Sequence, residues 1–283
     1  MNKYEQIFSQ FDLNLSDEII SKKVEDIIRK IDENVDLDIL RFLYSSIDLT
    51  SLNSDDSKES IRTLAEKVND LEESVSHVKN VAGICVYPNF VQTLKETLTA
   101  DVQIVSVAGG FPSSQTFMEV KMAEIALAVS DGADEIDIVL NGGLFLNENY
   151  DEVADELHEL KHACRGAKLK VILETGLLKS AIKIKKAAIL SIYSGADFLK
   201  TSTGKVYQGA SPEAVFVICE TIKEYYLLYD KKIGIKISGG IKSINDAVLY
   251  YFIVKEVLGK EWLSPDYFRI GASSLADNLL KVL

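Results

Sequence analysis

The sequence predicts a single (β/α)8 barrel, an α/β fold in which eight parallel strands alternate with helices. Its 283 residues are close to the usual length of one such barrel. From about residue 44 onward, short β-branched segments alternate with amphipathic segments of a dozen or more residues. Eight segments are strand candidates, and eight is the number that closes a barrel. An open doubly wound sheet is the alternative, because the first and last candidates are weak by pattern, although no Gly-x-Gly-x-x-Gly follows any of them.

An N-terminal helical extension, residues 1–43, is expected before the barrel of residues 44–283. Residues 1–80 contain 18 acidic and 10 basic side chains, which is typical of a solvated helical layer. Ser16 is a predicted N-cap, and the apolar residues behind it have helical spacing: Ile19, Ile20, Val24, Ile27 and Ile28.

The barrel strands are predicted in order from their β-branched content. They are Tyr44–Leu49, Ala82–Tyr87, Val102–Val107, Glu135–Leu140, Lys170–Thr175, Asp197–Ser202, Ile233–Ser238 and Tyr267–Gly271.

Composition excludes several classes of protein. Apolar residues make up 47% and charged residues 26%, which are ordinary values for a folded protein. The formal charge of −12 disfavours nucleic acid and anionic membrane surfaces as partners. The three cysteines have no disulfide or zinc spacing, and we find no signal peptide or membrane-length apolar segment, so we expect a cytoplasmic protein.

Strand alternation brings two lysines and one aspartate into the barrel interior. Isoleucines take the outward face of the seventh predicted strand, so Lys236 faces inward with Gly234 and Ser238. The same reasoning turns Asp137 inward. The sixth strand admits either facing, and the inward one places Lys200 on the strand beside Lys236.

A lysine in such a place is a candidate nucleophile. Desolvation and a neighbouring ammonium both lower its pKa, from about 10 towards about 7. A neutral amine attacks carbonyl groups. The alternative is that each lysine extends to the rim and pairs with a carboxylate, and that Asp137 forms a rim ion pair or a helix cap.

A phosphate site is predicted after the last two strands. The segments 238–240 (SGG) and 271–274 (GASS) offer backbone N–H groups where barrels of this kind bind phosphate, and Lys205 adds a nearby cation. Tight turns also require glycine, which is the structural alternative. A nucleotide P-loop is rejected, because Val206 follows Lys205 and no glycine lies five positions before Gly204.

Two other motifs suggest different chemistry. His158 and His162 match the zinc-protease pattern H-E-x-x-H, but their helix belongs to the outer ring and no convincing third ligand accompanies them, so a chance match is favoured. Cys85 is read as a packed small residue rather than a nucleophile, because no histidine accompanies it in the pattern.

The lysine-bearing segments resemble those of the deoxyribose-phosphate aldolases, class I aldolases built on a TIM barrel. The resemblance is carried by residues 197–205 (DFLKTSTGK) and 234–240 (GIKISGG). Supporting segments are 47–50 (IDLT), 84–88 (ICVYP), 132–137 (GADEID), 171–176 (VILETG) and 269–274 (RIGASS).

The resemblance implies reversible cleavage of 2-deoxy-D-ribose 5-phosphate to D-glyceraldehyde 3-phosphate and acetaldehyde, with no metal and no cofactor. It implies that Lys200 forms the Schiff base, and that Asp137 and Lys236 transfer protons. The residues implied around the phosphate are Gly204, Lys205, Gly239, Gly240, Ser273 and Ser274. Further predicted substrate-binding residues are Asp48, Thr50, Cys85, Thr203 and Gly271.

Several features depart from the family pattern. Residues 1–43 have no counterpart in compact members, Lys242 stands where arginine is common, and the chain ends at Leu283 without a tyrosine-bearing tail. We expect a homo-oligomer, either a dimer or a tetramer. A non-catalytic phosphosugar sensor is the remaining alternative, and the intact Lys200, Lys236 and Asp137 argue against it.

Overall fold

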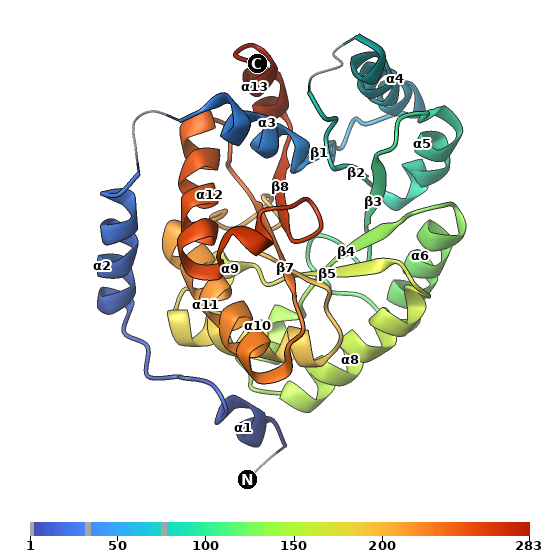
Figure 1. Ribbon diagram of the computed structural model, residues 1–283. Helices are drawn as coiled ribbons and strands as arrows, with labels where there is room; N and C mark the ends of the chain where they lie inside the picture. Colours follow the sequence, from blue (N-terminus) through green and yellow to red (C-terminus); the bar gives the residue numbers. More distant parts are fainter. Residues whose placement is uncertain (1–2, 32–34, 75–77) are drawn as a thin grey trace.

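The computed structural model describes residues 3–31, 35–74 and 78–283, and its strands form a closed parallel barrel in sequential order. The β1 strand also pairs with β8, which closes the barrel and excludes the open sheet (Figure 1). The eight strands are β1 (Ile47–Thr50), β2 (Gly83–Val86), β3 (Gln103–Val107), β4 (Glu135–Val139), β5 (Lys168–Ile172), β6 (Phe198–Lys200), β7 (Gly234–Ser238) and β8 (Phe268–Ala272).

Two predicted strand boundaries were wrong by more than two residues. The first strand begins at Ile47, because residues 44 and 45 complete the preceding helix. The fifth strand begins at Lys168 and ends at Ile172, since Glu174 has a left-handed φ of 54° and Thr175 starts a short helix. The left-handed backbone turns the chain out of the sheet at that point.

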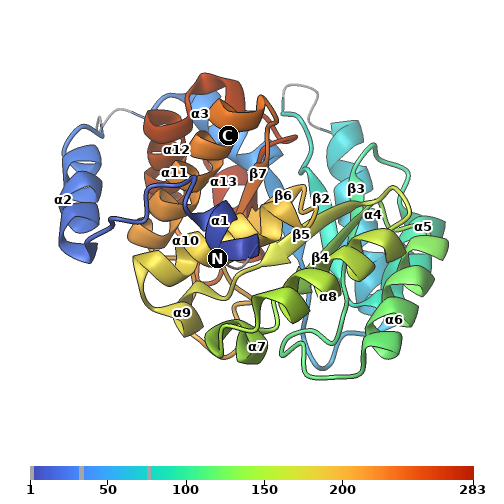
Figure 2. The same cartoon turned by 90° about the horizontal axis from the view of Figure 1, so that it is seen from below.

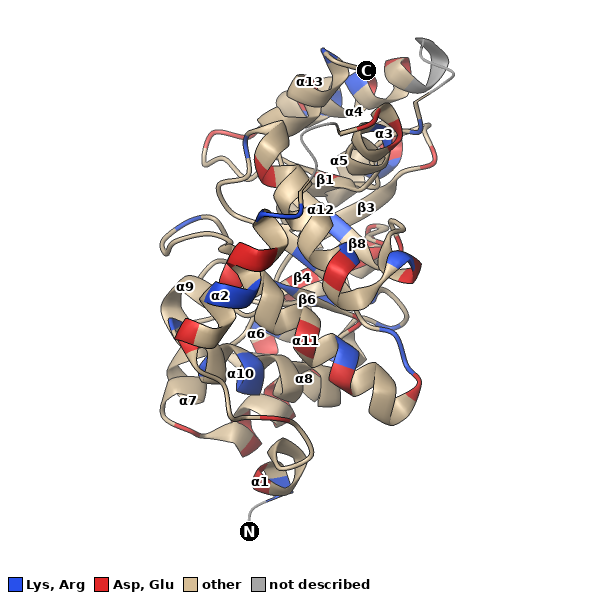
Figure 3. Ribbon diagram, turned by 60° about the vertical axis from the view of Figure 1, so that its left-hand side comes forward, with Lys and Arg blue, Asp and Glu red and all other residues tan. Residues whose placement is uncertain are grey.

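A layer of helices surrounds the barrel. Their apolar stripes cover the outward strand residues, including Ile136, Ile138, Ile235 and Ile237, which are fully buried. Acidic and basic positions are interspersed over the outer helices (Figure 3). The elements of this layer are α4 (Lys58–Ser74), η1 (Pro88–Phe90), α5 (Val91–Thr97), α6 (Met118–Ser130), α7 (Gly142–Leu146), α8 (Tyr150–Ala163), α9 (Thr175–Leu178), α10 (Ala181–Tyr193), α11 (Pro212–Tyr229), α12 (Ile244–Leu258), η2 (Lys260–Trp262) and α13 (Ser274–Leu280).

In the described part of the chain, three helices precede β1: α1 (Lys3–Phe8), α2 (Asp17–Ile28) and α3 (Leu37–Ser45). In both views α11 and α12 lie between α2 and the strands (Figures 1 and 2). Of the apolar residues predicted for α2, the structure buries Ile20, Val24 and Ile27. It leaves Ile19 and Ile28 exposed, so the apolar stripe is narrower than expected.

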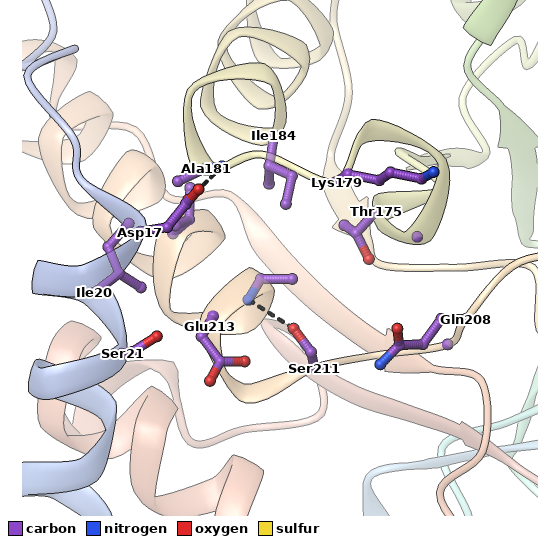
Figure 4. A pocket seen from close by; sticks show the side chains of 14 residues that line it. Asp17, Ile20, Ser21, Thr175, Lys179, Ala181, Ile184, Gln208, Ser211 and Glu213 are labelled. Carbon is purple, nitrogen blue, oxygen red and sulfur yellow. Dashed lines mark hydrogen bonds between the residues drawn. The ribbon is translucent and has the colours of Figure 1, made fainter.

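The carboxylate of Asp17 attaches α2 to the barrel layer. Ser16 occupies the N-cap position of α2 as predicted, but its side chain makes no capping hydrogen bond. Instead, Asp17 Oδ1 accepts a hydrogen bond from the backbone N–H of Ala181, 3.1 Å away, at the start of α10. A cavity of about 490 Å³ lies beside this contact, outside the barrel, with Ser21, Thr175 and other residues in its wall (Figure 4).

Cys85, Cys164 and Cys219 are all buried free thiols. None of the helices in the described segments is long and apolar enough to span a bilayer.

We predict that Asp17→Ala lowers the free energy of unfolding by about 1 kcal/mol, because an N-terminal N–H of α10 loses its acceptor. Urea denaturation measures this change. Glu18→Ala is the matched control, since Glu18 is also an exposed acid in the first turn of α2, and we expect a change within about 0.5 kcal/mol. Equal losses in the two variants would contradict the role given to Asp17.

Candidate active site

Asp137, Lys200 and Lys236 meet inside the barrel, and strand alternation predicted the inward facing of Asp137 and Lys236. Asp137 Oδ2 accepts hydrogen bonds from Lys200 Nζ at 2.8 Å and from Lys236 Nζ at 2.7 Å. The side chains come from β4, β6 and β7, and each is almost completely buried. The inward facing of Lys200, which the sequence left open, is therefore settled by this contact.

The two lysines differ in the direction of their pKa shifts. Burial lowers the pKa of Lys200, and the neighbouring ammonium of Lys236 adds to this effect, while Asp137 opposes it without reversing it. Burial acts on Lys236 in the same direction, but the carboxylates of Asp137 and Asp48 raise its pKa above the usual lysine value. Lys236 therefore stays an ammonium, and Lys200 is the residue more easily made neutral.

Asp137 stays ionised although it is fully buried. Burial alone would raise its pKa, but the charges of Lys170, Lys200 and Lys236 together hold the pKa well below the usual value of a carboxyl group. The carboxylate can therefore accept hydrogen bonds from both lysines at neutral pH.

Sequence reasoning missed three charged residues deeper in the lumen: Glu135, Lys170 and Arg269. Lys170 Nζ lies 3.0 Å from Asp137 Oδ1 and 2.5 Å from Glu135 Oε2. Arg269 contacts both Glu135 and Asp48. Strand alternation could have found Lys170, because Leu169 and Val171 on either side of it face the helices, but the predicted fifth strand started at Lys170 itself.

Glycine makes room for the lumen side chains. A Cβ atom on Gly271 would lie 3.2 Å from Lys236 Cε and 2.9 Å from Ser238 Cβ. A Cβ on Gly234 would lie 2.3 Å from the ring of Phe198, which fills the lumen near Lys170 and Arg269. Both positions require the absence of a side chain because the lumen is closely packed.

The predicted phosphate residues other than Ser274 gather at the mouth of the barrel around a pocket of about 200 Å³ that also reaches Lys200. Gly239 and Gly240 have φ values of 94° and 84°, so their turn needs glycine. Lys205 Nζ donates a hydrogen bond to the carbonyl of Leu52. The predicted residues that line this pocket are Thr50, Thr203, Gly204, Lys205, Gly239, Gly240, Gly271 and Ser273.

The remaining predicted binding residues lie elsewhere. Asp48 and Cys85 are fully buried within the lumen beneath the pocket. Ser274 lines a separate cavity between α4 and α13. Burial raises the pKa of the Cys85 thiol, so it is protonated at neutral pH and fits the packed role rather than that of a nucleophile.

The histidine motif lies on the outer face of α8. His158 and His162 are exposed, and His158 Nδ1 contacts the carbonyl of Ala154 in its own helix at 2.7 Å. Within residues 3–31, 35–74 and 78–283, we find no cluster of three side chains suited to hold a metal ion.

The fold and this site define a barrel enzyme with a buried lysine amine at the base of a polar mouth. Residues 42–259 match the model of the DeoC/LacD family aldolases. The chain belongs to this aldolase family.

Similar proteins agree with this assignment. The chain is 43% identical over 250 residues to a Caenorhabditis elegans relative, covering 87% of this chain and 82% of the relative. It is 39% identical over 244 residues to the deoxyribose-phosphate aldolase of Homo sapiens, covering 82% and 77% of the two chains. A tetrameric deoxyribose-phosphate aldolase from Aeropyrum pernix is 28% identical, with a TM-score of 0.66 over 88% of this chain and 97% of that one.

We predict that Gly271→Ala lowers aldolase kcat/KM by about tenfold or more, because the added methyl group displaces Lys236 from Asp137. Overpacking also costs about 1–3 kcal/mol of stability. Gly143→Ala is the control, since its Cβ would have only ordinary contacts at 3.5 Å. Steady-state kinetics and urea denaturation measure both effects, and equal kinetics in the two variants would contradict this packing argument.

Proposed function

We propose that this aldolase reversibly cleaves 2-deoxy-D-ribose 5-phosphate into D-glyceraldehyde 3-phosphate and acetaldehyde, through a Schiff base on Lys200. The observation that carries the proposal is the contact of Lys200 with the Asp137 carboxylate, which also contacts the ammonium group of Lys236, in a buried lumen. The similarity to deoxyribose-phosphate aldolases supplies the substrate.

In the cleavage direction, the neutral amine of Lys200 adds to the C1 aldehyde of the open-chain sugar, and loss of water gives an iminium ion. The iminium ion withdraws electrons from the C2–C3 bond. Removal of the C3 hydroxyl proton then breaks this bond, releasing glyceraldehyde 3-phosphate and leaving an enamine on Lys200. Protonation at C2 and hydrolysis release acetaldehyde and restore the amine.

Asp137 and Lys236 supply the proton transfers in this scheme. Their contact at 2.7 Å joins a carboxylate, which can accept a proton, to an ammonium, which can donate one. Lys200 and Lys236 both contact the same oxygen, Asp137 Oδ2. In the proposed scheme the proton acceptor and the proton donor therefore lie next to the carbon atoms that react on Lys200.

The phosphate binds at the mouth of the barrel in this proposal. Backbone N–H groups near Gly204, Gly239 and Gly240 surround the pocket, and Lys205 and Lys242 add positive charge. Lys205 would exchange the Leu52 carbonyl for a phosphate oxygen when substrate binds. This arrangement fixes one end of the sugar while its aldehyde end reaches Lys200.

We also propose that residues 1–43 form an extension to a barrel of residues 44–283, and that the protein is a homo-oligomer. The family match begins at residue 42, which supports the boundary. The tetrameric Aeropyrum pernix relative supports self-association. Light scattering at micromolar concentrations tests whether the protein is a homo-oligomer. A monomer at all of these concentrations would refute self-association.

Borohydride reduction in the presence of acetaldehyde should leave a two-carbon adduct on Lys200, identified by peptide mass spectrometry. The trapping rate should rise with pH through the lowered pKa of Lys200, because only the neutral amine reacts. Lys200→Leu should abolish the adduct, whereas Lys205→Met, which changes a lysine at the mouth, should retain it. An adduct on another lysine would refute the assignment.

Lys236→Leu and Lys205→Met should separate chemistry from phosphate binding. We expect Lys236→Leu to lower kcat by about a hundredfold or more with a small change in KM, because the proton donor is lost. Lys205→Met should mainly raise KM for the phosphorylated sugar. Steady-state kinetics with the phosphorylated and unphosphorylated sugars measure both, and comparable losses of kcat in the two variants would contradict the assigned roles.

A further inference from the structure

Six buried charged side chains form a closed ring of alternating sign in the lumen. Along the ring each cation contacts the carboxylate on either side of it, and Lys170 Nζ also lies 3.7 Å from Asp48 Oδ2 across the ring. The contacts run from Arg269 to Asp48 (2.6 Å), Lys236 (2.5 Å), Asp137 (2.7 Å), Lys170 (3.0 Å), Glu135 (2.5 Å) and back to Arg269 (3.0 Å). We call these six residues the ion ring.

The ion ring is electrically neutral, and Lys200 lies outside it. Three carboxylates balance the ammonium groups of Lys170 and Lys236 and the guanidinium of Arg269. Among the residues that the structure describes, Asp137 is the only carboxylate in ion-pair contact with Lys200, and Asp137 already contacts two ring cations. A protonated Lys200 would therefore be a seventh, unbalanced charge in a buried site.

We propose that the ion ring sets the charge of Lys200, and that Glu135, Lys170 and Arg269 are positioning residues that keep its amine neutral for Schiff-base formation. This inference rests on the proposed function and extends it to residues deeper in the barrel than the reacting groups. Glu135 and Arg269 act on Lys200 through the balance of charge rather than by touching the substrate.

Other groups near Lys200 do not upset this balance. On β2, the buried Cys85 is held as a neutral thiol. On β3, Val105 and Val107 are apolar. At the mouth, Lys205 is exposed and bonded to the Leu52 carbonyl.

Two more charged groups lie near the ends of the lumen. Glu174 accepts a hydrogen bond from Thr203 at 2.6 Å above the ring. At the closed end, Lys168 is 41% exposed and lies 3.8 Å from Glu135 and 3.7 Å from Asp266, where water screens its charge.

Shifts in pKa agree with the geometry. Burial lowers the pKa of Lys170, but Asp137, Glu135 and Asp48 raise it above the usual value. Burial also opposes the charge of Arg269, and Asp48 with Glu135 more than compensates. The ring cations are thus stabilised as cations, whereas the pKa of Lys200 falls.

The sign of the expected effect follows from the count of charges. Removing the cation in Lys170→Met leaves one carboxylate unbalanced, so Lys200 gains stability as an ammonium and its pKa rises. Removing the anion in Glu135→Gln leaves one cation in excess, so the pKa of Lys200 falls further. The double variant restores the balance.

The test measures the rate of acetaldehyde trapping on Lys200 against pH in the full-length protein. In the rate–pH profile, the acid limb is the range in which the rate falls because Lys200 becomes protonated. Relative to wild type, we expect this limb to move up by about one pH unit in Lys170→Met, which is about a tenfold loss of rate at pH values below it. It should move down in Glu135→Gln and return in the double variant. Lys170→Arg, which keeps the charge, is the matched control and should leave the limb in place.

The possible outcomes distinguish a failure of the proposed function from a failure of the ion-ring inference. If wild type forms no adduct on Lys200, the proposed function fails. If wild type is trapped but Lys170→Met and Glu135→Gln move the limb in the same direction or not at all, the ion-ring inference alone is wrong. A limb that moves in Lys170→Arg as in Lys170→Met would show that packing, rather than charge, is responsible.

A measurement on the wild-type protein tests the inference even if the variants fail to fold. An amine-acylating reagent is applied from pH 6 to 9, and labelling is read by peptide mass spectrometry. We expect Lys200 to react as a neutral amine at pH 7, and Lys170 and Lys236 to react at least about tenfold more slowly throughout. Labelling of either ring lysine as fast as Lys200 would overturn the inference.

Discussion

The contact of one carboxylate oxygen with two lysine side chains governs the chemistry of this barrel. Asp137 Oδ2 lies 2.8 Å from Lys200 and 2.7 Å from Lys236. A buried carboxylate strongly favours one neighbouring cation, but a second cation at the same oxygen repels the first. The pKa falls for the lysine that has fewer carboxylate contacts. That lysine is Lys200, because Lys236 also contacts Asp48.

The fold allows this contact because different strands contribute the charged side chains and the space that they occupy. The alternation of β4, β6 and β7 brings Asp137, Lys200 and Lys236 to adjacent places in the lumen. Gly271 on β8 leaves the volume that Lys236 needs. A barrel filled with branched apolar side chains, the usual solution, would have no room for such a cluster.

Much of the fold and the centre of the site could be predicted from the sequence. Eight β-branched segments predicted the closed barrel, and alternation in Ile233–Ser238 predicted the inward facing of Lys236. Alternation says nothing about which carboxylate a lysine reaches across the lumen, because that depends on the register between distant strands such as β1 and β7. The contact of Asp48 with Lys236 follows from the registers of β1 with β8 and of β8 with β7.

Local pattern also misjudged features that depend on tertiary contacts. Ser16 has the right residue type and position for a cap, yet it makes no capping hydrogen bond, while Asp17 reaches α10 of the barrel layer. Ser273 and Ser274 follow the same strand, but Ser273 lines both the mouth pocket and the cavity between α4 and α13, whereas Ser274 lines the second of these and not the first. Neighbouring residues of similar chemistry therefore receive different environments.

The lumen holds an apolar cluster beside the ion ring, and the reactive amine needs both. The cluster consists of Leu52, Cys85, Val105 and Val107. The side chains of the ion ring come from β1, β4, β5, β7 and β8. Apolar walls alone would lower the pKa of any buried lysine without choosing one, and paired charges alone would keep every lysine protonated. Lys200 is buried where the paired charges are already satisfied, so the same interior stabilises three cations and disfavours the fourth.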